Sequence, residues 1–72
     1  MYLRVMRRDR PDTYDDDEVA RVRAHLRSGP GVAEVSSVSQ HPRGGHAVHL
    51  TVDGSMDALL GYFATGPYVL VL

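Results

Sequence analysis

The chain has 72 residues, a formal net charge of −1 and eight basic residues, all of them arginine. It contains no cysteine, which excludes disulfides, thiolate metal ligands and cysteine redox chemistry. The length predicts one domain over residues 1–72, near the lower size limit for a core that is stable without help. No stretch reaches the ~20 apolar residues of a membrane span, and the N-terminus carries no recognisable signal peptide. We therefore expect a cytoplasmic protein with no membrane partner.

The charges are distributed unevenly along the chain. Four arginines lie within residues 1–10, and an acidic cluster follows within residues 12–18. Opposite charges this close in sequence neutralise each other locally, so they do not predict a long-range field that steers nucleic acid.

The first predicted element is a strand over residues 2–7, which ends before Pro11 because proline lacks an amide hydrogen. Leu3 and Val5 form its predicted core face. The opposite face carries Tyr2, Arg4 and Met6.

A helix is predicted next, because apolar side chains recur at helical spacing from Val19 to Leu26. Thr13 is predicted to cap this helix, with Asp16 in the place where a capping box carries an acidic or amide side chain. The segment Ser28–Gly31 contains two glycines and a proline and ends the helix.

Two further strands are predicted on either side of a turn at residues 41–45. The first, residues 32–39, alternates imperfectly, which indicates an edge strand with a bulge or a strong twist. The second, residues 46–52, alternates cleanly. Its predicted core face is Val48, Leu50 and Val52, and His49 lies on the other face.

A second helix carries an apolar stripe between Met56 and Phe63, and a last strand covers residues 68–72. The order βαββαβ is the split βαβ arrangement. Right-handed crossovers place both helices on the same side of the sheet. The sequence therefore predicts an α+β ferredoxin-like sandwich, with a four-stranded antiparallel sheet and two helices on one face.

The face of the sheet without helices is the main functional surface that the sequence predicts. The last strand does not alternate between apolar and polar residues, so both of its faces are apolar. An exposed apolar face of this kind indicates association with a second copy or with a partner protein. The predicted interface residues are Tyr2, Met6, His49, Tyr68, Leu70 and Leu72.

Metal and nucleic-acid sites are not predicted. His46 and His49 lie three residues apart on one strand and point to opposite faces. His41 and His46 flank the turn and could approach each other, but no third metal ligand is evident. We interpret these histidines as ordinary turn and surface residues. Residues 43–50 superficially resemble the third-strand signature of RNA-recognition modules but lack its stacking aromatic residues, so no nucleic-acid partner is expected.

The turn Asp9-Arg10-Pro11, the helix after it and the glycine-containing turn into the second strand resemble those of ACT-type regulatory domains. The resemblance is topological, covers most of the chain and matches no specific family motif. It implies a small-ligand sensor with a binding turn at Asp9, Arg10 and Asp12. ACT domains carry glycine after the proline, where this chain has Asp12, and this difference argues against amino-acid binding.

No constellation of catalytic residues is recognisable, so we predict no catalytic residue, cofactor or metal. A small dimeric α/β-barrel enzyme remains an alternative, and it would need a polar cavity between the helices and the sheet. The favoured interpretation is a non-catalytic association module. The ACT-like sensor is the other alternative.

Overall fold

The computed structural model describes residues 1–71 and confirms the predicted α+β ferredoxin-like sandwich. The elements in chain order are β1 (Tyr2–Arg7), the 3₁₀ turn η1 (Asp16–Glu18), α1 (Val19–Arg27), β2 (Val32–Gln40), β3 (His46–Val52), α2 (Met56–Ala64) and β4 (Tyr68–Val71).

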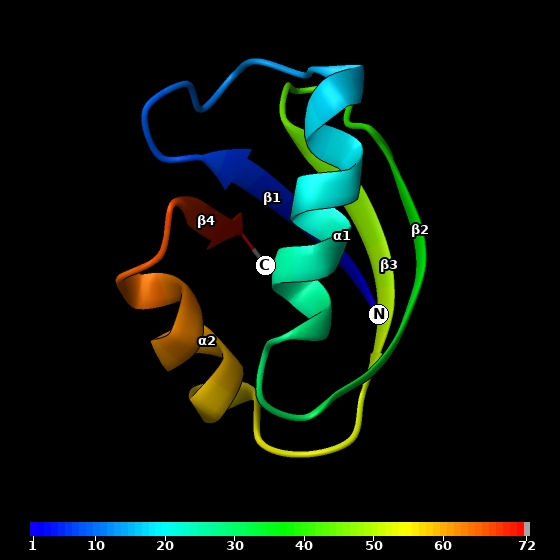
Figure 1. The fold of residues 1–72 in the computed structure, drawn as a ribbon, viewed down its shortest axis with the longest axis vertical. Coiled ribbons are helices and arrows are strands. Elements are labelled where there is room, and N and C mark those ends of the chain that lie inside the picture. The colour runs from blue at the N-terminus through cyan, green and yellow to red at the C-terminus, as the bar shows by residue number, and fades with distance from the viewer. Residues whose placement is uncertain (72) are drawn as a thin grey trace.

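The four strands form one antiparallel sheet in the order β2-β3-β1-β4. Both helices lie on the same side of this sheet, with α1 across its middle and α2 beside β4 (Figure 1). The N-terminal strand β1 is therefore a central strand, paired with β3 on one side and with β4 on the other. The opposite side of the sheet, which we call the open face, has no covering layer within residues 1–71.

The core lies between the sheet and the two helices. It contains most of the predicted apolar stripes of both helices and the alternating residues of β1 and β3, whereas Leu60 of α2 is exposed. Its buried hydrophobic side chains are Leu3, Val5, Val22, Leu26, Val35, Val48, Leu50, Leu59, Phe63 and Tyr68.

The start of the first helix differs from the prediction. Thr13 does not cap it, because the Thr13 amide donates to the carbonyl of Arg10 at 3.2 Å and the residue belongs to the preceding loop. Asp15 caps η1 instead, and its Oδ1 accepts from the amide of Asp17 at 2.9 Å. The extra turn η1 ends at Glu18, which directly precedes α1 and is buried.

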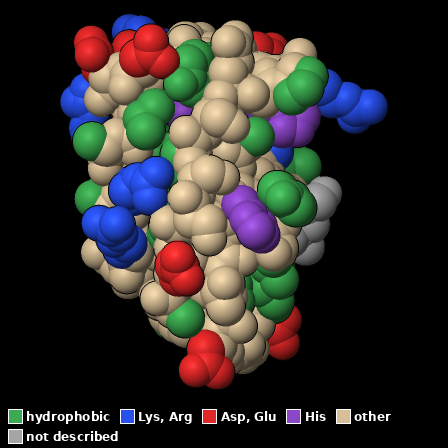
Figure 2. Space-filling view, turned by 90° about the vertical axis from the view of Figure 1, so that its right-hand side faces the viewer, with side chains coloured by type: hydrophobic (Ala, Val, Ile, Leu, Met, Phe, Trp, Pro, Cys, Tyr) green, Lys and Arg blue, Asp and Glu red, His purple; other side chains and the backbone are tan. Residues whose placement is uncertain are grey.

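The strand β2 lies at the edge of the sheet, as predicted. Its pairing with β3 shifts register between Val32 and Glu34 and again between Val35 and Ser37, which confirms the predicted irregularity. Figure 2 looks onto this edge, where backbone and uncharged polar side chains fill the middle and hydrophobic side chains are scattered. Bulges and a polar surface of this kind disfavour pairing of an edge strand with another chain.

The loop between β1 and η1 rests on the turn between β2 and β3, and both lie at the top of Figure 1. Gly44 and Gly45 make this close approach possible, with φ angles of +103° and +73°. A Cβ on Gly44 would lie 2.7 Å from the carbonyl oxygen of Asp12, and one on Gly45 would lie 2.9 Å from that of Val5. Glycine is the only residue that fits both the backbone conformation and the space.

We expect Gly44→Ala to lower the free energy of unfolding by roughly 2–3 kcal/mol, because it adds backbone strain to a clash with Asp12. Gly61→Ala is the matched control. Gly61 lies inside α2 with nothing within 4 Å of its added Cβ, so this variant should gain about 0.5–1 kcal/mol. Urea denaturation measures both changes, and equal effects of the two substitutions would contradict the close approach.

Candidate functional site

The open face is defined by the cross-strand pairs, because directly paired residues project to the same side of a sheet. Tyr2 pairs with His49, while Arg4 pairs with Ala47 on β3 and with Val71 on β4. The open face of β3, β1 and β4 therefore carries Tyr2, Arg4, Met6, Ala47, His49, Thr51, Val69 and Val71.

Three of the predicted interface residues lie on this face. Tyr2 is 79% exposed, and Met6 and His49 are half-buried. The ring of Tyr2 stacks on the imidazole of His49 with 4.2 Å between centroids and 10° between planes. The two rings thus form one parallel aromatic stack at the end of the sheet.

The predicted placement of Tyr68 and Leu70 on the open face is wrong. Tyr68 is only 6% exposed, and Leu70 packs against the core. An unbroken apolar strand contains no alternation from which to decide which residues face inward, so only the pairing with β1 settles it. Val69 and Val71 occupy the open face of β4 instead. Leu72 lies outside the described residues.

A groove of about 520 Å³ opens on this face beside the β2–β3 turn. It lies between Tyr2, Arg4 and Val71 of the sheet and residues 41–43 of the turn. The guanidinium of Arg4 donates from Nε to the carbonyl of Gly44 at 2.9 Å and from Nη2 to that of Arg43 at 2.7 Å. These bonds direct the only charged side chain of this face on β1, β3 and β4 toward the turn.

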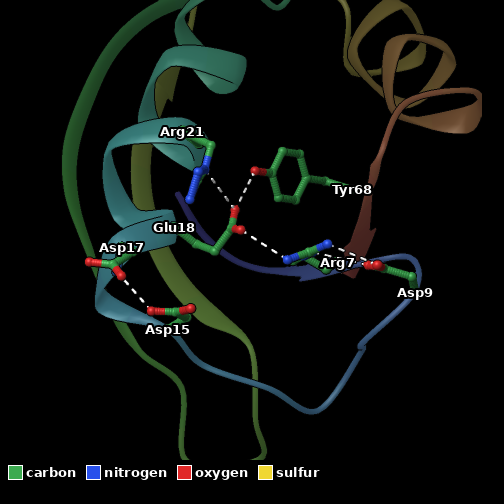
Figure 3. A network of polar contacts seen from close by, with 7 residues as sticks. All are labelled: Arg7, Asp9, Asp15, Asp17, Glu18, Arg21 and Tyr68. Atoms are coloured by element: carbon green, nitrogen blue, oxygen red, sulfur yellow. Dashed lines mark hydrogen bonds and ion pairs between the residues drawn. The ribbon is translucent and has the colours of Figure 1, made fainter.

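On the other side of the sheet, the buried carboxylate of Glu18 joins four elements (Figure 3). Glu18 is 6% exposed. Arg7 of β1 donates from Nη1 to Oε1 at 3.0 Å, and the hydroxyl of Tyr68 on β4 donates to Oε2 at 2.8 Å. Arg21 of α1 places its Nε 3.6 Å from the same Oε2. We call these four residues the Glu18 network.

The Glu18 network explains how so small a core can contain the negative charge of a carboxylate. Burial of a carboxylate costs several kcal/mol unless donors and an opposite charge replace the lost water. Here both oxygens accept a hydrogen bond, and Arg7 supplies the charge. Burial, aided by the hydrogen bond to Glu18 and its charge, raises the pKa of Tyr68 to about 12. Tyr68 therefore stays a donor throughout the physiological range.

A cleft of about 690 Å³ opens beside this network. Its lining comes from the end of β1, the residues that follow it, the start of α1 and the start of β4. The lining residues are Arg7, Arg8, Asp9, Glu18, Arg21, Pro67 and Tyr68.

The three residues of the predicted ligand turn do not converge on one pocket. Asp9 lines this cleft and is held by Arg7, whose Nε and Nη2 donate to its two oxygens at 3.0 and 2.8 Å. Asp12 is 86% exposed on the other side of the loop, with Oδ1 3.6 Å from Nη2 of Arg4. Arg10 is exposed between them.

The histidines near the turn divide into two environments. His41 stays in the turn, where its Nδ1 accepts from the amide of Arg43 at 3.0 Å. The prediction of a surface position is wrong for His46, which is fully buried with its ring centroid 4.9 Å from that of Tyr14. It pairs with Val5 and faces the core, as the alternation with Val48 requires. Neither of its ring nitrogens has a hydrogen-bond partner in residues 1–71.

His25 is a half-buried histidine that the sequence did not single out. Its ring packs between α1 and α2 against Tyr62, Phe63 and Tyr68. The hydroxyl of Tyr62 donates to the His25 carbonyl at 2.9 Å, so Nδ1, 3.3 Å from that hydroxyl, is assigned as the protonated nitrogen. Nε2 is buried with no partner among the described residues, and burial lowers the pKa of the ring.

The Glu18 network was also missed, although the sequence contains a signal for it. Glu18 lies four residues before Val22 and eight before Leu26, so it continues the apolar stripe of the helix by one turn. Arg7 likewise has the same alternation phase as Leu3 and Val5. Two opposite charges, each in a core-facing phase, are the pattern that predicts a buried ion pair.

Comparison with protein-family models, with curated proteins and with solved structures finds no match to this chain. Within residues 1–71, no helix combines the length and apolar character needed to cross a bilayer. The same residues contain no group of three or more histidine, aspartate or glutamate side chains placed to hold a metal ion.

We expect Glu18→Gln to cost about 2–4 kcal/mol of unfolding free energy, because an amide cannot accept both hydrogen bonds and leaves Arg7 without its buried partner. Asp17→Asn is the control, since Asp17 is exposed and its loss should stay within about 0.5 kcal/mol. Denaturation curves measure both. The pKa of Tyr68, followed by alkaline absorbance titration, should fall in Glu18→Gln. Similar stabilities of the two variants would contradict a structural role for the network.

Protonation of His25 should make the fold less stable in mild acid. Its folded pKa lies below the value of about 6.5 in the unfolded chain, so the unfolded chain takes up the proton first as the pH falls. The contribution of His25 is therefore complete above pH ~6.5 and is lost below it. His25→Phe keeps the aromatic packing and should flatten the dependence of unfolding free energy on pH between about 5 and 7. An unchanged slope would contradict this role.

Proposed function

We propose that this chain works by association, as a homodimer in which the open faces of two sheets pack against each other. The observation that supports it most directly is Tyr2, a large aromatic side chain that is 79% exposed and stacked on His49. Met6, Val69 and Val71 continue the apolar surface across β1 and β4. Contiguous apolar surface of this kind on a small domain usually marks an interaction site.

The charge on this face favours a second copy over a strongly charged partner. Arg4 is the one charged side chain that β1, β3 and β4 present on the open face, and the edge strand β2 adds Glu34, which pairs with Thr51. Two carbonyls of the turn hold its guanidinium toward one end of the face, and the carboxylate of Asp12 lies 3.6 Å away. The central part of the face is therefore close to neutral, so two identical faces can meet with little repulsion.

The size of the face sets the expected affinity. Strands about 4.8 Å apart and about six residues long give the sheet a flat footprint of roughly 400 Å² on each copy. Two copies then bury roughly 800 Å² of flat area in total, and the surface of projecting side chains adds to this value. The sum is close to the ~1,000 Å² at which specific interfaces begin. A reversible dimer with a micromolar dissociation constant is the expected result. Its formation would stabilise each small subunit by mass action.

Sedimentation equilibrium over about 0.1 to 100 µM protein tests this proposal, because a dissociation constant of a few micromolar lies inside this range and the mean mass then rises from near the monomer to near the dimer. Tyr2→Glu and Val71→Glu each place a charge on the open face and should abolish the rise. Ala58→Glu is the matched control, since Ala58 is exposed on α2 and adds the same charge away from the face. A monomer at every concentration, or equal weakening by Ala58→Glu, would overturn the proposal.

A further inference from the structure

The cleft beside the Glu18 network contains an arginine, Arg8, that forms no ion pair with a carboxylate of residues 1–71. Arg8 donates from Nε to the carbonyl of Gly66 at 3.1 Å and from Nη2 to those of Phe63 and Ala64 at 3.0 and 3.3 Å. These acceptors are neutral groups at the end of α2, where a positive charge is favourable. Its Nη1 donates to no protein group in residues 1–71 and remains available to a ligand.

Arg21 is the second available guanidinium in the cleft. Its side chain is 61% exposed, and its ion-pair contact within residues 1–71 is the 3.6 Å approach of Nε to Glu18. Both of its terminal nitrogens are therefore available. Arg8, just after β1, and Arg21 of α1 line the same cleft, and Pro67 and the buried Tyr68 also belong to its lining.

The acidic side chains of the cleft are already satisfied. Arg7 donates to both oxygens of Asp9 and to one oxygen of Glu18, and Tyr68 donates to the other oxygen of Glu18. The cleft thus has one more cationic than acidic side chain, and the unmatched donors belong to Arg8 and Arg21. It is poorly suited to a cation, because its arginines outnumber its carboxylates and each carboxylate oxygen already accepts a hydrogen bond.

We propose that this cleft binds an oxyanion, a phosphate or a carboxylate group, between the guanidinium groups of Arg8 and Arg21. Arginine presents planar N–H pairs that match the oxygens of both groups. A phosphate has more acceptor oxygens than a carboxylate, so it fits two guanidinium groups better. The cleft lies on the helix side of the sheet, opposite the open face, so this site does not depend on dimer formation.

Titration with inorganic phosphate and with acetate at constant ionic strength tests the proposal. The resonances of the Arg8 and Arg21 Nε–H groups, followed by NMR, should shift and saturate at millimolar phosphate. Arg21→Gln should weaken binding about tenfold, the effect of losing one charge-assisted contact. Arg27→Gln removes the same charge from an exposed position later on α1 and should change the affinity less than twofold.

The two anions distinguish the source of the ligand group. Tighter binding of phosphate assigns the site to a phosphorylated ligand, and tighter binding of acetate assigns it to a carboxylate. Shifts that never saturate, or equal weakening by Arg21→Gln and Arg27→Gln, would overturn the proposal. Repeating the titration in Tyr2→Glu separates this result from the dimer, because anion binding should persist there even if association is lost.

Discussion

A carboxylate inside a core of ten hydrophobic side chains is the constraint on which much of this structure depends. Glu18 can remain there only with its oxygens bonded and its charge matched. The groups that meet this need, Arg7 and Tyr68, are 11 and 50 residues away in sequence. The carboxylate thus fixes where α1 begins relative to both β1 and β4. The pairing of β4 with β1 places Tyr68 inward, where its hydroxyl donates to Glu18, and leaves Val69 and Val71 on the open face.

The architecture could be predicted because turns and helix ends are clearly marked in this sequence. Pro11, the Ser28–Gly31 segment and the glycines of the 41–45 turn separate the elements, and the apolar spacing is clear in β1, α1, β3 and α2. The interface was predicted only in part. Tyr2 and His49 belong to alternating strands, whereas β4 is apolar at every position and its facing depends on pairing. The buried charges were overlooked because single charged residues usually mark the surface.

The sheet separates two surfaces of different chemistry. One is flat, aromatic and aliphatic, and it is suited to another flat surface. The other is a cleft rich in guanidinium groups at the meeting point of β1, α1 and β4. Arg7 borders this cleft and follows Met6, which lies on the open face, so adjacent residues of β1 contribute to both surfaces. A shift of β1 would therefore change both the open face and the cleft.

The seating of the β1–η1 loop on the β2–β3 turn has a consequence for the order of folding. Asp12 and Gly44 are 32 positions apart, and the loop has no surface to rest on until the turn has formed. Closing a loop of that length lowers the chain entropy before any stabilising contact forms. The first connection along the chain should therefore reach its native path late, after the hairpin that follows it. During synthesis, the β1–η1 loop would therefore stay without its native contacts until residue 45 has emerged from the ribosome.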